Sequence, residues 1–127
     1  MVSSESAPRA LEVEVRSAQD TVVVTVHGEI DMASAPRLQS ALDEALRDAP
    51  AAVVVDMTNV GFLGSAGLSV LLAASEATGS GGLRVVPSDA ARRPIEVTSL
   101  DRLLTVFDSV EDALAVNETV NETQAPN

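Results

Sequence analysis

The first patterned segment of the chain alternates apolar and polar residues, as a half-buried β-strand does. This alternation runs from Leu11 to Arg16, and a period of two places every second side chain on the same face of a sheet. Residues 21–26, TVVVTV, are rich in β-branched side chains and predict a second strand. The four residues SAQD separate the two segments, so we expect a β-hairpin.

Three further segments predict strands that are connected to one another by helices. Residues 51–57, AAVVVDM, form a continuous apolar run that ends in a polar position, which is typical of a central strand buried on both faces. The segment TNVGF after it is expected to be a short loop with a strand-like apolar piece. Residues 83–86 and 103–107 predict the fourth and fifth strands.

Apolar residues spaced three and four apart predict helices between and after these strands. We expect the first helix to begin near Ser34 as its N-cap and to have Pro36 in its first turn. Its apolar stripe consists of Leu38, Ala41, Leu42, Ala45 and Ala49. The second is expected over residues 65–78, with Gly79 at the position that commonly ends a helix.

Two shorter helices complete the pattern. Ser88 or Asp89 should cap the third, which carries Pro94 in its interior and is expected to be kinked or shortened there. Its apolar positions are Ala91, Ile95 and Val97. Asp108 or Ser109 should cap the last helix, which has acidic residues in its first turn.

The element order is therefore β-β-α-β-α-β-α-β-α, an α/β fold with one mixed sheet of about five strands and about four helices. The hairpin adds an antiparallel edge to a parallel core. The length of 127 residues suits one domain. We expect residues 10–116 to form it, residues 1–9 to be a disordered arm, and residues 117–127 to be a disordered tail.

Composition narrows the classes of function. The chain has no cysteine and no lysine, and His27 is its one histidine, so thiol catalysis, a Schiff base and a multi-histidine metal site are excluded. A net charge of −11 disfavours binding to nucleic acid or to an anionic membrane and favours a basic protein partner. No apolar run is long enough to span a bilayer, and no secretion signal is visible, so we expect a cytoplasmic protein. No cofactor is indicated.

The apolar run from Val60 to Leu72 is broken by the four small residues Gly64-Ser65-Ala66-Gly67. Ser65 is the only hydroxyl in this break and opens the second helix, at the carboxyl end of the sheet, where functional sites usually lie. It could be a helix N-cap. It could be a nucleophile, but the first glycine of the G-x-S-x-G motif is absent. It could also be a phosphoacceptor, on which a phosphate would create a binding switch.

Three segments together resemble the STAS domains of bacterial anti-sigma factor antagonists. The central segment is VVVDMTNVGFLGSAGLSVLL, the earlier one is VTVHGEIDMASAPRLQSAL, and the last is VTSLDRLLTVFDSVEDAL. The resemblance covers about residues 10–116. It implies a protein that binds an anti-sigma factor, often a serine kinase, and frees a sigma factor. It also implies no enzymatic activity of the chain's own.

The same resemblance implies how the switch works. The kinase phosphorylates the motif serine, which maps onto Ser65, and a PP2C-type phosphatase restores binding. Asp31 and Asp56 map onto two polar positions that lie near the phosphoacceptor in this family. The other candidate partner-binding residues are Ser34, Gly64, Ala66 and Gly67.

The segment departs from the family pattern at the residue before the serine. The family usually has aspartate there, and this chain has Gly64. Ala66 stands where the family often has serine or threonine, which leaves Ser65 as the one acceptor. An alternative function remains open at this point, in which the chain is a STAS interaction module, a scaffold or a transport-system subunit, that is not phosphorylated at Ser65.

Overall fold

The computed structural model describes residues 11–18, 20–78 and 83–115. Within these ranges a five-stranded sheet has its strands in chain order, β1-β2-β3-β4-β5. The strands are β1 (Glu12–Ala18), β2 (Thr21–Ile30), β3 (Ala52–Leu63), β4 (Leu83–Pro87) and β5 (Thr105–Val106). The helices between them are α2 (Ala35–Leu46), α3 (Ser65–Thr78), α4 (Asp89–Val97) and the short 3-10 helix η1 (Leu100–Arg102).

The pairing of the strands confirms the mixed α/β fold expected from the sequence. β1 pairs with β2 in antiparallel orientation, and every later pair is parallel. Parallel neighbours need a crossover connection, and the successive helices provide one between each pair of strands. The predicted antiparallel edge on a parallel core is therefore confirmed.

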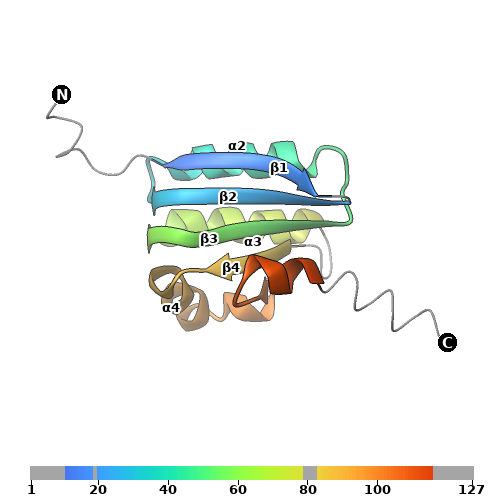
Figure 1. Cartoon of the computed structure of the whole chain (residues 1–127). Helices are drawn as coiled ribbons and strands as arrows, with labels where there is room; N and C mark the ends of the chain where they lie inside the picture. The colour runs from blue at the N-terminus through green and yellow to red at the C-terminus, as the bar shows by residue number, and fades with distance from the viewer. Residues whose placement is uncertain (1–10, 19, 79–82, 116–127) are drawn as a thin grey trace, which may run out of the picture.

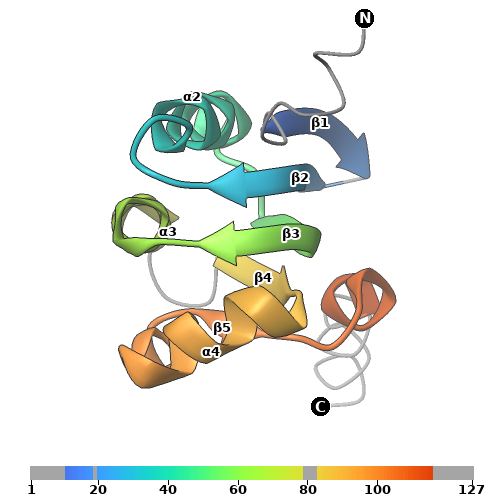
Figure 2. The same ribbon diagram turned by 90° about the vertical axis from the view of Figure 1, so that its left-hand side faces the viewer.

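Helices cover both faces of the sheet, although unequally. α2 and α3 lie side by side on one face, and the C-terminal helical segment, residues 110–115, lies on the other (Figures 1 and 2). The first four residues of β3, Ala52 to Val55, are all buried. This burial explains why the sequence is continuously apolar there, because alternate side chains contact different helical layers.

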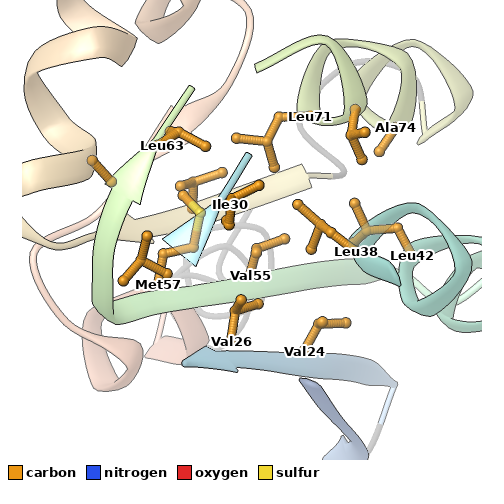
Figure 3. Packing of buried hydrophobic residues seen from close by; sticks show 14 of the residues in the cluster. Val24, Val26, Ile30, Leu38, Leu42, Val55, Met57, Leu63, Leu71 and Ala74 are labelled. Atoms are coloured by element: carbon orange, nitrogen blue, oxygen red, sulfur yellow. The ribbon is translucent and has the colours of Figure 1, made fainter. Parts of the chain in front are cut away.

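The larger core lies between the sheet and the pair α2 and α3 (Figure 3). Val24, Val26 and Ile30 of β2 contribute to it from one strand, and Leu38 and Leu71 contribute from the two helices. A fully buried side chain of this kind stabilises the fold by about 1.5–3 kcal/mol. Val23, Val54, Val86 and Ala113 form a smaller cluster on the opposite face.

β2 and β3 extend several residues beyond their predicted ends, whereas β1 and β4 end within two residues of theirs. β2 continues through His27 and Gly28 to Ile30, and β3 continues through the segment predicted as a loop to Leu63. The register shifts between Thr25 and His27 and again between Gly28 and Glu29. Such irregularities let a strand continue through polar residues by re-aiming its side chains, so the apolar pattern alone underestimated both lengths.

The region after α4 also differs from the prediction. The fifth strand is two residues long, and the 3-10 helix η1 precedes it where no element was expected. Val97 is 72% exposed and does not join the core, unlike Ala91 and Ile95. Ala49 lies beyond the end of α2 with a positive φ of 49° and is exposed, so the apolar stripe of that helix ends at Ala45.

Hydrogen bonds fix the starts of the last two helices. The Ser88 hydroxyl accepts a bond of 3.1 Å from the Ala91 N–H, which confirms Ser88 as the cap of α4. Pro94 lies inside α4, which ends three residues later. The Ser109 hydroxyl accepts a bond of 3.0 Å from the Asp112 N–H, which favours Ser109 over Asp108 as the cap of the last helix.

Buried Arg84 joins β4 to the last helix, because its Nη1 donates a bond of 2.7 Å to the Ala113 carbonyl. Burial lowers the pKa of this guanidinium. The expected arm, the expected tail and the expected helix-ending Gly79 lie outside the described residues.

Candidate functional site

Ser65 is the first residue of α3 and is exposed. The Gly64 carbonyl accepts the first helical bond, 3.1 Å from the Leu68 N–H, so Gly64 and not Ser65 precedes the helix in the cap position. Among the residues that the structure describes, the Ser65 hydroxyl makes no hydrogen bond. The N-capping role considered from the sequence is therefore not observed. The hydroxyl is exposed to solvent and stabilises no part of the described fold through a hydrogen bond.

Gly64 brings the end of β3 close to the end of β2. Its N–H donates a bond of 2.9 Å to the Ile30 carbonyl. A Cβ on Gly64 would lie 3.0 Å from Cε2 of Phe62, and the Phe62 side chain is 50% exposed. The aromatic ring thus occupies the space beside the residue before Ser65, where the family pattern has an acidic side chain.

Gly67 allows α3 to pack tightly against the sheet. A Cβ at this position would lie 2.5 Å from Cγ2 of Ile30 and 2.6 Å from Cδ1 of Leu63. Both neighbours are buried, so the space for a side chain is absent. Ala66 is half-buried and packs against the same core. These two small residues hold the start of α3, and with it Ser65, against the end of β2.

Asp31 and Ser34 close the loop between β2 and α2 by bonding to each other. The Ser34 N–H donates to Oδ1 of Asp31 at 2.9 Å, and the Asp31 N–H donates to the Ser34 hydroxyl at 2.9 Å. The same hydroxyl lies 2.8 Å from the Glu29 carbonyl and 3.1 Å from Oδ1 of Asp31 and shares its one proton between them. Ser34 holds the N-cap position, but its side chain accepts no bond from the helix.

These bonds have an electrostatic consequence for Asp31. The backbone N–H of Ser34, followed by the Ser34 hydroxyl, lowers the pKa of the Asp31 carboxyl below its ordinary value. Hydrogen bonds donated to a carboxylate favour its charged form. Asp31 is exposed and is therefore a fixed negative charge on the loop that follows β2.

Asp56 orders a different part of the chain. Its Oδ1 accepts bonds from the Thr58 N–H at 3.1 Å and from the Thr58 hydroxyl at 2.8 Å. It pairs with Thr25 of β2 and Val86 of β4, in the middle of the sheet. These bonds order the segment that follows Asp56, which was expected to be a loop and proves to be strand.

The parallel register brings some of the candidate residues together and separates others. Ile30 pairs with Leu63, so Asp31 and Ser65 follow the ends of two adjacent strands at the same edge of the sheet. Asp56 pairs with Thr25, five residues before Ile30 along β2. At the usual rise of a strand, this places Asp56 roughly 17 Å from the edge that carries Asp31 and Ser65. His27 lies three residues before Ile30 and is exposed.

The sequence did not reveal a shallow groove between α2 and α3. We call it the α2–α3 groove; it encloses about 330 Å³ and is lined by Met32, Ala35, Pro36, Gln39, Ala66, Ser69, Val70 and Ala73. Met32 is 83% exposed. An apolar residue inside the polar loop between Asp31 and Ser34 was the one signal in the sequence that could have indicated it.

The described residues offer neither a metal-binding cluster nor a membrane-spanning helix. Across residues 11–18, 20–78 and 83–115, no cluster of three or more histidine, cysteine or acidic side chains is arranged to hold a metal ion. None of the helices in the same residues is long and apolar enough to cross a membrane. The features that remain at the Ser65 edge are an exposed hydroxyl, a fixed carboxylate and an apolar groove.

Known proteins are similar to this chain in sequence and in fold. The chain is 38% identical over 112 residues to the anti-sigma-F factor antagonist RsfB of Mycobacterium tuberculosis H37Rv, covering 86% of this chain and 91% of the relative. The crystal structure of an anti-sigma factor antagonist from Mycobacterium paratuberculosis superposes with a TM-score of 0.81 at 40% identity, covering 87% of this chain and 96% of the other.

More distant structures show the fold alone. The antagonist SpoIIAA in its unphosphorylated form matches with a TM-score of 0.68 at 18% identity, over 87% of this chain and 97% of that one. Residues 12–113 match the sequence profile of the STAS domain. The resemblance seen in the sequence motifs is confirmed, and the chain belongs to the STAS domain family.

Proposed function

We propose that this chain is an anti-sigma factor antagonist that binds an anti-sigma factor and thereby frees a sigma factor. The observation that carries the proposal is the exposed Ser65 hydroxyl, which opens α3 and makes no bond within the described fold. The name of the mycobacterial relative, which is 38% identical, supports the same role. Ser65 is the proposed phosphoacceptor, and its modification ends binding.

The start of α3 can accept a phosphate without unfolding. The first N–H groups of a helix have no partner within the helix, and their partial positive charge stabilises an anion placed there. A phosphoserine adds about −1.5 to −2 charges near neutral pH. The effect of the phosphate therefore falls on the surface that a partner contacts and leaves the core unchanged.

Charge on the chain itself strengthens the proposed switch. The net charge is −11, so electrostatic steering favours a basic partner. Asp31 follows the neighbouring strand and stays ionised, because its hydrogen bonds to Ser34 lower its pKa. A phosphate on Ser65 would add bulk and charge to an edge that already carries negative potential, and a docked partner would have to accommodate both.

The chemistry of the switch belongs to the partners. In the forward step the Ser65 oxygen attacks the γ-phosphorus of ATP, the serine proton goes to a base of the kinase, and ADP leaves. In the reverse step a phosphatase of the PP2C type uses water to release inorganic phosphate. Because the forward step consumes ATP, we place this cycle in the cytoplasm. Gly64 contributes no carboxylate, so recognition by the kinase rests on the surrounding surface.

The test combines phosphorylation with binding. Each anti-sigma factor encoded in the source genome is purified and incubated with ATP and this chain, and mass spectrometry maps the phosphosite. Ser65→Ala should abolish phosphate incorporation and retain binding. Ser65→Glu should weaken binding at least tenfold, because it places a carboxylate where the phosphate would be.

A matched control separates charge at Ser65 from charge in general. Ser40 is an exposed serine on α2 that does not line the α2–α3 groove, and Ser40→Glu should bind as the wild type does. Equal affinity of wild type, Ser65→Ala and Ser65→Glu for every anti-sigma factor would refute the switch. A chain that captures only scaffold or transporter subunits, unphosphorylated, would favour the interaction module instead.

A further inference from the structure

The α2–α3 groove stands out chemically from the rest of the surface. Its eight lining residues, given above, include no charged side chain, although 21% of the chain is charged. Gln39 and Ser69 are its only polar side chains, and both are neutral. Depletion of charge is what distinguishes the centre of a protein interface from the remaining surface.

The groove is continuous with the proposed switch. Ala66, which follows Ser65 directly, forms part of its wall. A partner that covers Ser65 therefore reaches the groove without a second docking site. Its volume of about 330 Å³ lies at the low end of the range for small-molecule sites, which suits inserted side chains better than a cofactor.

Met32 is positioned as an anchor at the mouth of this groove. It is 83% exposed, yet the loop that carries it is closed by the reciprocal bonds of Asp31 and Ser34. A side chain on an ordered loop loses less freedom when it is covered. Exposed methionines also adapt their shape to a partner's surface.

Charge decides which partner fits. A second copy of this chain carries the same net charge of −11, and like net charges oppose self-association. A basic protein that presents an apolar side chain would have no such cost. We propose that the α2–α3 groove receives an apolar side chain of the anti-sigma factor, so that Met32 and the groove form the apolar centre of the interface and Ser65 lies at its edge.

This inference rests on the proposed function, and the experiment keeps the two distinguishable. Ala73 and Ala77 are both exposed on α3, but only Ala73 lines the groove. Ala73→Glu should weaken binding of the anti-sigma factor at least tenfold in a calorimetric titration, whereas Ala77→Glu should bind as the wild type does. Circular dichroism of both variants checks that the helix is retained.

A second pair of variants removes an exposed side chain without adding charge. Met32→Ala should weaken binding about five- to tenfold, as truncation of an interface anchor does. Val97→Ala is its control, because Val97 is also exposed but lies on α4. Neither side chain is part of the core, so the folds should be unaffected.

Each outcome of these measurements distinguishes the groove inference from the proposed function. If Ser65→Glu weakens binding while Ala73→Glu and Met32→Ala bind as the wild type, the switch stands and the groove inference is wrong. If no anti-sigma factor binds the wild type, the proposed function is wrong, and an anti-sigma factor cannot be the occupant of the groove. If sedimentation shows a wild-type dimer that Ala73→Glu dissociates, the occupant is a second copy and the inference is overturned.

Discussion

Replacing Gly67 with alanine tests whether tight packing of α3 against the sheet holds the start of that helix in place. The added Cβ would lie 2.5 Å from Cγ2 of Ile30 and 2.6 Å from Cδ1 of Leu63. Carbon atoms do not approach this closely without displacement. Both neighbours are buried, so neither can turn into solvent to make room.

Two opposing effects set the size of the change. Alanine in place of glycine favours a helix interior by up to about 1 kcal/mol. Overpacking of a filled core costs about 1–3 kcal/mol. The end of the Leu63 side chain can rotate, but Cγ2 of Ile30 is attached directly to a β-branched carbon. We therefore expect a net loss of about 1–2 kcal/mol, which lowers Tm by roughly 5–10 °C in a domain of this size.

Thermal and urea unfolding followed by circular dichroism measure this loss. Gly61→Ala is the matched control, because nothing lies within 4 Å of a Cβ at Gly61, and it should change stability by less than about 0.5 kcal/mol. Leu63→Ala should cost less in the Gly67→Ala background than alone, because contacting residues couple by about 0.5–3 kcal/mol. A Gly67→Ala protein as stable as the wild type would refute the packing argument.

Three other predictions concern single side chains. Ser65→Ala should leave the free energy of unfolding within about 0.5 kcal/mol of wild type. Ser88→Ala should lower it by about 1–2 kcal/mol, because the Ser88 hydroxyl caps α4 and also donates a bond of 2.6 Å to the Val60 carbonyl. Urea titration of both variants distinguishes them. Because its pKa is lowered in the fold, ionised Asp31 stabilises the folded state at neutral pH. This stabilisation is lost as the pH falls below about 4 and through the folded-state pKa. Asp31→Asn should therefore reduce the loss of stability measured between neutral and acid pH, and an unchanged loss would contradict this. Arg84→Met should speed amide hydrogen exchange in residues 110–115 and leave exchange in α3 unchanged, because Arg84 donates a hydrogen bond from β4 to the Ala113 carbonyl of that helix.

Local signals in the sequence identified the start of α3 and the cap of α4. The small residues around Ser65 interrupt a long apolar run, and that interruption coincides with the change from strand to helix. Ser88 lies three residues before Ala91, the first residue of the apolar pattern predicted for that helix, and it caps the helix. These features depend on neighbours within a few residues, which is the range over which propensity and capping act.

Features that depend on the partner strand or helix were not predictable. The polar residues Thr58 and Asn59 suggested a loop, yet β3 continues because Asp56 and the neighbouring β2 hold the irregular register. Val97 follows the apolar spacing of α4 but lies beyond the surface that the sheet covers. The α2–α3 groove combines residues from a loop and two helices, and no sequence period places them together.

The two edge strands of the sheet bear on whether the protein self-associates when no partner is bound. β1 forms one edge and alternates outward charges at Glu12, Glu14 and Arg16, while β5 forms the other and is two residues long. Charged and very short edge strands are the usual protection against edge-to-edge pairing between molecules. Under the proposed function, an antagonist released from its partner would therefore remain as separate molecules and would not extend its sheet by pairing with a second copy.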